Sequence, residues 1–261
     1  MIRFFEKKDE HAVVAIWAEA FGDKESEILK FLHTFGQYML VLEFEGKPVS
    51  MLTLLPVTAN GEKGRYVYAV ATEKSSRGKG FAGELIEYAK QYIEENGEKF
   101  LVILPQSESL FGFYGKFGFY TLKCAIRIEK TGCISGENAA SAEKISAIEY
   151  FECRKEYFSG RKYVEWDVKM LNFFAEIYDG CYLKLSDGNK KIGFAFCYSC
   201  GNKVVVPELL AYDGEFAALN AICRLFGKDN AACNKEAENG KNTAMIYPES
   251  FSDSYFGIGM N

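Results

Sequence analysis

The sequence predicts an α/β (α+β) protein in which a mixed, largely antiparallel central sheet is flanked by helices and followed by a second, degenerate unit of the same kind. One observation is a junction of strand, glycine-containing turn and helix within residues 66–95. Apolar residues run through Tyr66–Ala71, and from Phe81 they recur at helical spacing. The other observation is the order of elements before residue 130, which the chain repeats between residues 142 and 226.

Residues 1–130 contain the elements of one complete unit. The helix after the glycine turn has Leu85, Ile86 and Ile93 on one side and glutamates on the other, and Asn96-Gly97 is a suitable C-terminal stop. We expect a strand, two helices, three strands, a helix, a strand, a helix and two closing strands. The expected ranges are Ile2–Phe5, Asp9–Phe21, Lys24–Thr34, Tyr38–Phe44, Val49–Thr58, Tyr66–Ala71, Phe81–Glu95, Phe100–Leu104, Ser107–Lys116, Phe119–Leu122 and Ala125–Glu129.

The second half is expected to form a unit of its own. Residues 131–141 are small and polar and contain glycine, so we expect a linker there, between an N-terminal domain at 1–130 and a C-terminal domain at 142–261. The elements expected after the linker are helices at Ala142–Phe158 and Asp167–Tyr178, strands at Cys181–Leu185, Ile192–Tyr198 and Lys203–Ala211, and a helix at Glu215–Phe226.

The turn Arg77-Gly78-Lys79-Gly80-Phe81-Ala82 has the features of an anion site. Where a strand leads through a tight turn into a helix, several backbone N–H groups lack intrahelical partners and point at one place, with the positive end of the helix dipole behind them. A phosphate or pyrophosphate suits that place, and Gly78 and Gly80 let the backbone approach it. The alternative is a turn that only reverses the chain, with Arg77 and Lys79 as solvated charges.

Two other phosphate-binding loops are excluded. Phe81 stands where a P-loop needs Ser or Thr for magnesium, and the glycines do not follow the Gly-x-Gly-x-x-Gly pattern. The hexapeptide reads Arg-x-x-Gly-x-Ala, which resembles the acyl-CoA pyrophosphate loop of the GNAT N-acetyltransferase superfamily. Further on, Phe113-Tyr114-Gly115-Lys116-Phe117-Gly118-Phe119 resembles that family's Phe-Tyr-x-Lys-x-Gly-Phe signature. The two motifs stand in the family's order and spacing, and the resemblance covers residues 1–130 well.

The resemblance implies a GNAT fold followed by a degenerate GNAT-like unit. Chains of this type resemble the tandem GNAT proteins akin to the enhanced-intracellular-survival acetyltransferases, without their lipid-carrier-like third domain. In the second unit, Tyr212-Asp213-Gly214-Glu215 takes the place of the loop and lacks its basic residue and glycine pair. Asp213 and Glu215 would repel a pyrophosphate, so we expect one CoA site per chain, in the N-terminal half.

The resemblance also assigns residues to acetyl-CoA, the expected cosubstrate. The loop amides would hold the pyrophosphate, and Arg77 and Lys79 would add positive charge. The strand edge at Tyr68–Ala71 would pair with the pantetheine amides. Ser107 and Ser109 would contact the pantetheine arm, with helix capping as their alternative. The cofactor-binding residues expected in this way are Tyr68, Ala69, Val70, Ala71, Arg77, Gly78, Lys79, Gly80, Phe81, Ala82, Ser107 and Ser109.

Tyr114 is the expected catalytic residue. The resemblance implies that its phenol protonates the departing CoA thiolate, and a group with a reference pKa of about 10 is a reasonable donor. The alternative is packing, because phenylalanines surround it in the sequence. The sequence does not identify the base that removes the proton from the acceptor ammonium. The available carboxylates, each of which is otherwise a surface residue, are Glu43, Glu73, Glu108 and Glu208.

Composition and charge limit the other partners. The chain is 48% hydrophobic and 26% charged, as ordinary globular proteins are, and its net charge of −5 argues against nucleic acid or an anionic membrane as the main partner. No apolar run reaches the ~18 residues of a membrane span, and the N-terminus lacks the apolar region of a signal peptide. We therefore expect a cytoplasmic protein.

The cysteines are expected to be reduced thiols without a metal. The chain has eight of them and no secretory signal. Cys197-Tyr198-Ser199-Cys200 could bind zinc or cycle its redox state, but a zinc site needs a second pair, and Cys223 and Cys233 are too far apart in sequence to supply it. The reaction implied by the resemblance needs no metal.

The sequence therefore predicts an N-acyltransferase that moves an acetyl group from acetyl-CoA to an amine acceptor by direct attack in a ternary complex. The alternative is a noncatalytic acyl-CoA-binding or interaction protein of the same fold. A small polyamine, an aminoglycoside, an amino acid and a protein amine all stay open as the acceptor, and so does the oligomeric state.

Overall fold

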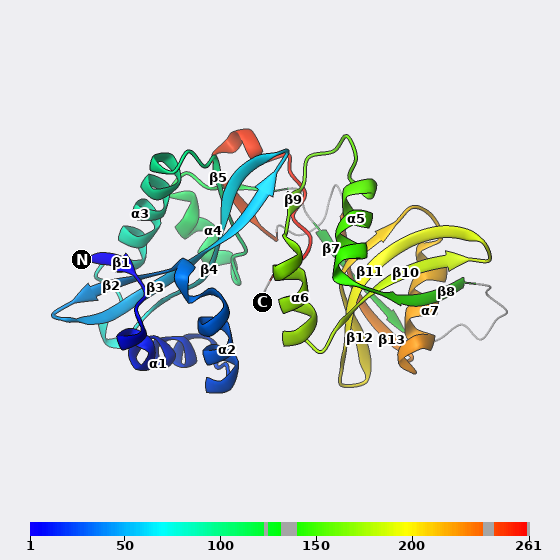
Figure 1. Cartoon of the computed structure of the whole chain (residues 1–261), viewed down its shortest axis with the longest axis horizontal. Coiled ribbons are helices and arrows are strands. Elements are labelled where there is room, and N and C mark those ends of the chain that lie inside the picture. Colours follow the sequence, from blue (N-terminus) through cyan, green and yellow to red (C-terminus); the bar gives the residue numbers. More distant parts are fainter. Residues whose placement is uncertain (123–124, 132–139, 237–242, 260–261) are drawn as a thin grey trace. The chain divides into compact units, whose positions relative to one another are not determined.

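The computed structural model describes residues 1–122, 125–131, 140–236 and 243–259 (Figure 1). The chain divides into two compact units, each with its own sheet. The first unit comprises Met1–Thr121 together with Ala244–Ser252, and the second comprises Leu122–Thr243 together with Asp253–Met260. Within the described part of the chain, no helix is long and apolar enough to cross a membrane.

The sheet of the first unit has the strand order β1-β2-β3-β4-β5-β14-β6. Its paired neighbours run antiparallel except β4 and β5, which are parallel. The strands are β1 (Ile2–Phe4), β2 (Met39–Phe44), β3 (Lys47–Ala59), β4 (Glu62–Thr72), β5 (Phe100–Ile103), β6 (Tyr120–Thr121) and β14 (Met245–Tyr247). The helices are α1 (Glu10–Phe21), α2 (Glu25–Phe35), α3 (Phe81–Glu95) and α4 (Glu108–Gly115), with short 3-10 turns η1 (Lys7–Asp9), η2 (Gly36–Tyr38), η3 (Lys74–Ser76) and η4 (Glu249–Phe251).

Helices cover both faces of this sheet, with α3 on one side and α1 and α2 on the other (Figure 1). The apolar stripe of α3, including Leu85 and Ile93, packs in one buried cluster with Val67 of β4. On the opposite face the ring of Tyr68 lies 5.7 Å from Trp17 of α1. Because consecutive residues of a strand point to opposite faces, Val67 and Tyr68 mark the two sides of the sheet.

The sheet of the second unit has the order β7-β13-β12-β11-β10-β8, and only β12 and β13 are parallel. The apolar face of α7 packs on it, with Leu219 and Ile222 in the same cluster as Val204 and Val206. The strands are β7 (Ala125–Thr131), β8 (Ala140–Ile145), β10 (Cys181–Asp187), β11 (Lys190–Cys200), β12 (Lys203–Ala211) and β13 (Asn230–Glu236), besides the short β9 (Val164–Glu165). The helices are α5 (Ala147–Tyr157), α6 (Val168–Ile177) and α7 (Glu215–Phe226).

The second unit repeats the first, which confirms the predicted pair of related folds. An antiparallel meander of three strands, a helix and a parallel strand form β2-β3-β4-α3-β5 in one unit and β10-β11-β12-α7-β13 in the other. The strand next to β5 is β14 from near the end of the chain, and the strand next to β13 is β7. Strand β14 thus takes the place in the first sheet that β7 takes in the second, although β14 follows the second unit's strands in the sequence.

The place of β7 in the second sheet corrects the prediction that Ala125–Glu129 closes the first sheet. The residues do form a strand, but β7 pairs with β13 from Ala125↔Glu236 to Thr131↔Asn230. Local sequence indicates a strand and does not say with which sheet it pairs. Neither β13 nor β14 was predicted, and residues 132–139 of the predicted linker lie outside the described residues.

The predicted helix at Ala142–Phe158 is also corrected in part. Residues 140–145 form β8, which pairs with β10, and the helix α5 begins only after Ser146. There the Ser146 hydroxyl accepts from the Glu149 N–H at 3.2 Å, and the Glu149 carboxylate accepts from the Ser146 N–H at 2.8 Å. This Ser-x-x-Glu capping box is the sequence signal that would have placed the start of the helix.

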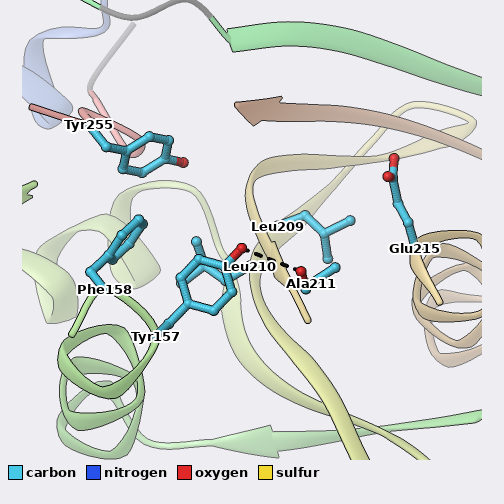
Figure 2. Close-up of a pocket in the computed structure, with 7 residues that line it drawn as sticks. All are labelled: Tyr157, Phe158, Leu209, Leu210, Ala211, Glu215 and Tyr255. Carbon is cyan, nitrogen blue, oxygen red and sulfur yellow. Dashed lines mark hydrogen bonds between the residues drawn. The ribbon is translucent and has the colours of Figure 1, made fainter. Parts of the chain in front are cut away.

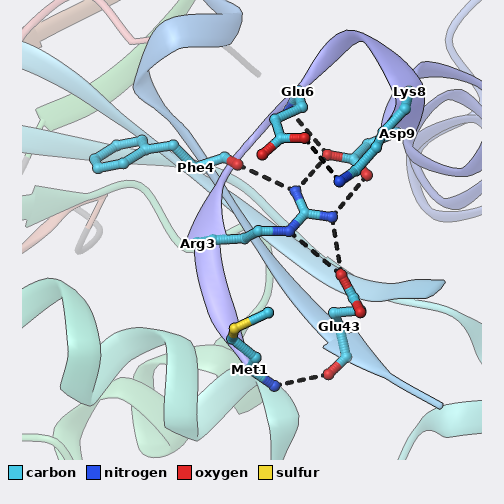
Figure 3. A network of polar contacts seen from close by, with 7 residues as sticks. All are labelled: Met1, Arg3, Phe4, Glu6, Lys8, Asp9 and Glu43. Carbon is cyan, nitrogen blue, oxygen red and sulfur yellow. Dashed lines mark hydrogen bonds and ion pairs between the residues drawn. The ribbon is translucent and has the colours of Figure 1, made fainter. Parts of the chain in front are cut away.

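Arg3 ties the N-terminal strand to its neighbours (Figure 3). Its guanidinium donates to the Asp9 carboxylate at 2.6 and 2.9 Å and to the Glu43 carboxylate at 2.9 Å. Asp9 is only 2% exposed and also accepts from the Glu6 N–H. The hydrogen bonds from Arg3 lower the pKa of Asp9 by more than burial raises it. One cation thus joins β1, η1 and β2.

We expect Arg3→Gln to lower the free energy of unfolding by about 1–3 kcal/mol near neutral pH, because the buried Asp9 carboxylate loses its main partner. The pKa of Asp9 is lower in the folded than in the unfolded state. Its contribution is therefore fully present above the unfolded pKa of about 3.9 and is lost as the pH falls through the folded value. Urea unfolding at several pH values should show the difference between parent and variant shrinking below about pH 4.

Lys7→Gln is the matched control, since it removes an exposed ion pair with Glu10 in the same segment. Such pairs contribute little, so no measurable change is expected. Equal losses of unfolding free energy in the two variants would contradict the role of Arg3 as the partner of Asp9. So would a loss in the Arg3 variant that does not depend on pH.

Candidate functional site

The central feature of the site is an edge of β4 that no strand of its sheet covers. The parallel pairing of β4 and β5 runs from Gly64↔Phe100 to Val67↔Ile103, where β5 ends. Strand β4 continues to Thr72 and stays paired with β3 on its other side. Among the described residues, Tyr68–Ala71 thus pair in the sheet on one side only. An extended ligand that carries amide groups can pair with such an edge.

Strand β4 bends where it leaves β5. Its register with β3 shifts between Met51 and Thr53, so Ala69 and Val70 together lie opposite one residue of β3. This is a β-bulge, and it puts Ala69 at a φ of 52°, a left-handed conformation that is rare for a residue with a Cβ. Bulges and unusual backbone conformations occur often at functional sites because they redirect a strand. The bulge therefore lies within the free edge itself.

The glycine turn follows this edge after the short η3. Gly78 and Gly80 have φ values of 79° and 88°, and a Cβ built on either would find no heavy atom within 4 Å. Gly80 is the N-cap of α3, and the first helical bond runs from the Glu84 N–H to the Gly80 carbonyl at 3.1 Å. The amides before Glu84 in the first turn are therefore left outside the helical ladder. The turn is open on its outer side and offers these amides to an anion.

The two cations of the turn have different local roles. Arg77 donates from Nε to the Thr72 carbonyl at 3.0 Å and so fastens the turn to the end of β4. Lys79 is exposed, and its Nζ lies 5.0 Å from the centre of the Phe44 ring. Phe81, the first residue of α3, is buried and anchors the helix, whereas Ala82 is half-buried beside it.

Tyr114 lies in α4 and is only 4% exposed. Its ring centre is 5.0 Å from that of Phe113 and 5.9 Å from that of Phe119. It belongs to the same buried cluster as Val67 and Ile103, the last pair between β4 and β5. Burial raises the pKa of the phenol well above its ordinary value, so the hydroxyl keeps its proton at neutral pH. The packing of Tyr114 is observed, and its chemical role stays a prediction.

A close contact joins the first turn of α3 to the segment that follows α4. A Cβ built on Gly83, in the first turn of α3, would lie 2.8 Å from the tip of the Phe117 ring. Phe117 also packs against Phe113, with ring centres 5.1 Å apart. Gly83 therefore lets the end of the Phe-Tyr-x-Lys-x-Gly-Phe stretch lie against the helix that follows the glycine turn.

The remaining residues considered for the site are two serines and four carboxylates. Ser107 is the N-cap of α4 without a side-chain capping bond, and its Oγ is 3.0 Å from that of Ser109 on the surface. Of the four carboxylates considered as the base, Glu43 is paired with Arg3, and Glu73 accepts from the Ser76 hydroxyl. Glu108 is exposed in the first turn of α4, and Glu208 lies in the second unit. The geometry therefore singles out none of them as the base.

The second unit has the same divergence of strands without the same opening. Pairing of β12 with β13 ends at Val206↔Cys233, and β12 continues to Ala211. A cavity of about 190 Å³ lies along this part of β12 and reaches Glu215 at the start of α7. Figure 2 shows Tyr157, Phe158 and Tyr255 on one side of it and Glu215 on the other. No basic side chain lines it, so the cavity does not suit a pyrophosphate.

A buried ion pair involves Glu208, in the part of β12 that runs past β13. Glu208 is fully buried and receives two hydrogen bonds from Arg154 of α5, at 2.8 and 2.9 Å, and one from the Tyr150 hydroxyl at 2.7 Å. Burial alone would lower the pKa of Arg154, but the Glu208 carboxylate keeps it raised. A Cβ on Gly257 would lie 1.9 Å from a Glu208 oxygen, so the backbone near the C-terminus passes directly over the carboxylate.

Glu208 was one of the four carboxylates expected at the surface as a possible base. Its burial and its pairing with Arg154 were not predicted. An acidic residue inside the apolar run Val204–Ala211 was the available signal, because a carboxylate in a buried strand needs a partner. The sequence could not indicate that Arg154, 54 residues away, is that partner.

The cysteine pair does not form a metal site with neighbours in the described structure. Cys197 is buried in β11, where its Sγ donates to the Cys181 carbonyl at 3.8 Å, whereas Cys200 is exposed. Among the described residues, no group of three or more His, Cys, Asp and Glu side chains could hold a metal ion.

Comparisons with known proteins agree with this geometry. Residues 1–122 match the family model described as acetyltransferase (GNAT) domain. A search of curated proteins found no match at the threshold used.

Several solved structures share the fold over nearly the whole chain. A GCN5-related N-acetyltransferase from Anabaena variabilis superposes with a TM-score of 0.74 at 13% identity, covering 94% of this chain and 72% of that one. Eis1 from Mycobacterium abscessus gives 0.62 at 10% identity, with 94% and 73% covered. A tandem GNAT protein from the clavulanic acid biosynthesis pathway gives 0.57 at 10% identity, with 94% and 98% covered. At these identities the likeness shows the fold of both units.

We expect Glu208→Gln to destabilise the second unit by about 3–5 kcal/mol, because it leaves the buried Arg154 charge without its counter-charge. Urea unfolding followed by tryptophan fluorescence measures this, since Trp166 is buried in the same unit. Asp213→Asn is the control. Asp213 lies in the turn between β12 and α7, and the variant breaks only its exposed ion pair with Lys190. A Glu208 variant as stable as this control would show that the pair is not needed for the fold.

Proposed function

Residues 1–122 belong to the acetyltransferase (GNAT) domain family, and from this premise we propose that the protein is an N-acetyltransferase that moves an acetyl group from acetyl-CoA to an amine. The observation that carries the proposal is the free edge of β4 at Tyr68–Ala71, which leads straight into the open glycine turn and the start of α3. Pantetheine amides would pair with the edge, and the pyrophosphate would lie at the first-turn amides of α3.

Each predicted site residue has a role consistent with its position. Backbone groups of Tyr68, Ala69, Val70 and Ala71 would bind pantetheine, and those of Gly78, Lys79, Gly80, Phe81 and Ala82 would bind the pyrophosphate. Arg77 would hold the turn in place through Thr72 while its charge favours the phosphates. Ser107 and Ser109, exposed at the start of α4, would contact the pantetheine arm.

The reaction would be a direct transfer. The neutral amine attacks the thioester carbonyl carbon, so a C–N bond forms and the C–S bond then breaks. The thiolate that leaves takes a proton from the Tyr114 hydroxyl, and the proton lost by the attacking nitrogen goes to a carboxylate or to water. The position of Tyr114 supports this role, because its side chain packs in one cluster with Val67 and Ile103, the last pair before β4 and β5 separate.

The proposal is tested by incubating the protein with acetyl-CoA and a panel of amines. The panel contains a polyamine, an aminoglycoside, free amino acids and lysine peptides. Release of free CoA thiol together with a product heavier by one acetyl group supports the enzyme. Saturable CoA binding without release for any amine would instead support a noncatalytic acyl-CoA-binding protein.

Other parts of the proposal follow from composition. On the basis of its net charge of −5 we propose no nucleic-acid or membrane partner. We place the protein in the cytoplasm because its eight cysteines are expected to be reduced thiols. The reaction as written needs no metal. The second unit would bind no CoA, because the turn that corresponds to the glycine turn carries Asp213 and Glu215 and lacks its basic residue and glycine pair.

Gly80→Asp should abolish CoA binding while the parent binds about one CoA per chain. The variant puts a side chain and a negative charge where the pyrophosphate meets the start of α3. Isothermal titration calorimetry measures both affinity and stoichiometry. Gly22→Asp is the control, because Gly22 has a similar φ of 78° and equally open surroundings but lies after α1. Unchanged affinity in the Gly80 variant, or two equivalent sites in the parent, would overturn the assignment.

Tyr114→Phe should lower kcat by about a hundredfold or more with little change in CoA affinity, since proton donation acts in the transition state. The ring and its packing remain, so stability should change by no more than about 1 kcal/mol. Because burial raises the pKa of Tyr114, the parent should not lose activity through its ionisation as the pH rises from 7 to about 10.

Tyr120→Phe is the control, since Tyr120 is an exposed tyrosine nearby in sequence. A Tyr114 variant with full activity, when acyl transfer is rate-limiting, would leave water as the proton source. A large fall in melting temperature without a selective loss of kcat would show that Tyr114 only packs the core.

A further inference from the structure

An exposed phenylalanine stands beside the glycine turn. Phe44, the last residue of β2, is 38% exposed although large apolar side chains in this unit are mostly buried. Its ring centre is 5.3 Å from that of Phe81, the residue that follows Gly80 at the start of α3. A flat apolar surface therefore lies one ring away from the amides to which we assign the pyrophosphate.

Two lysines accompany this ring. The Lys79 Nζ lies over the ring, 5.0 Å from its centre. Lys47 is the direct partner of Phe44 across the β2–β3 hairpin, so the two side chains project from the same face of the sheet. The neighbouring carboxylate of Glu43 is bound by Arg3, as Figure 3 shows, and so does not neutralise either lysine directly. An aromatic surface with two cations beside it suits a ligand that is flat and anionic.

We propose that Phe44, Lys79 and Lys47 bind the nucleotide end of the acyl-CoA donor, with the adenine ring stacked on Phe44 and the lysines paired with its phosphates. This proposal rests on the proposed function, which places the pyrophosphate at Gly80. Every nucleobase has a face that stacks on an aromatic side chain, and ammonium groups pair strongly with phosphate oxygens. The adenosine is joined to the pyrophosphate directly, so a ring next to Phe81 is within its reach.

The proposal predicts a donor preference that the rest of the site does not explain. Pairing with β4 and binding at α3 use only the pantetheine and phosphate parts of the donor. A surface for adenine makes the nucleotide itself contribute to affinity. The protein should therefore use acetyl-CoA at lower concentration than acetyl-4′-phosphopantetheine, which has the same reacting group and arm without the nucleotide.

The test compares these two donors in the Phe44→Ala variant. The KM for acetyl-CoA should rise about tenfold, within the range known for loss of base–aromatic stacking, with kcat unchanged. The KM for acetyl-4′-phosphopantetheine should not change. Adenosine 3′,5′-bisphosphate should bind the parent in a calorimetric titration and bind the variant at least about tenfold more weakly. Phe44→Trp, which keeps a stacking surface, should behave like the parent.

Phe4→Ala is the matched control. Phe4 is 37% exposed on the adjacent β1, but its ring packs against Tyr92 further along α3, with centres 5.6 Å apart. This variant should leave both KM values and the bisphosphate affinity unchanged.

Three outcomes would overturn the proposal. One is an equal rise in KM for both donors, another is the same effect from Phe4→Ala, and the third is an unchanged affinity for the bisphosphate in Phe44→Ala. If neither donor is turned over by the parent, the proposed function fails, and the bisphosphate titration still decides whether Phe44 binds a nucleotide.

Discussion

The structure depends on one constraint, which is that β4 runs past the end of β5. Beyond Val67, Tyr68, Ala71 and Thr72 of β4 still pair with β3, whereas pairing with β5 has ended. Backbone polar groups away from water need partners, so this edge favours a ligand that offers amides of its own. The bulge at Ala69, the open glycines of the turn and the start of α3 all follow along the same few residues. The candidate site is therefore a property of where one strand pair ends.

The second unit meets the same constraint in another way. Its β12 also runs past the end of β13, but there Glu208 is bound by Arg154, and the backbone at Gly257 passes over the carboxylate. A buried ion pair costs desolvation, and it is tolerated here because Arg154 donates twice and Tyr150 once to the same carboxylate. One fold thus occurs twice in the chain, once with an open glycine turn after the strand and once with a buried ion pair and an acidic turn in the corresponding places.

The sequence predicts the local parts of this arrangement well. The strand, turn and helix at residues 66–95 and the helix α7 were placed correctly, because periodicity and glycines act over short distances. The left-handed Ala69 was not foreseen, since pairing with β3 and not the local sequence imposes it. The partnership of Arg154 with Glu208 and the sheet that β7 joins are long-range facts as well. Pattern reasoning identifies elements, and it does not say which elements pair.

Strand β14, near the end of the chain, belongs to the sheet of the first unit. Strand β14 pairs with β5 from Met245↔Ile103 to Tyr247↔Leu101 and with β6 on its other side. Lys90 of α3 lies 4.8 Å from the centre of the Tyr247 ring, and Phe119 packs near the same ring. Since Ile103 is the last residue of β5 that pairs with β4, β14 supports the point at which the free edge begins. The geometry of that edge therefore depends on residues more than 140 positions away from Ile103, which explains why the motif-bearing segment alone did not reveal the whole site.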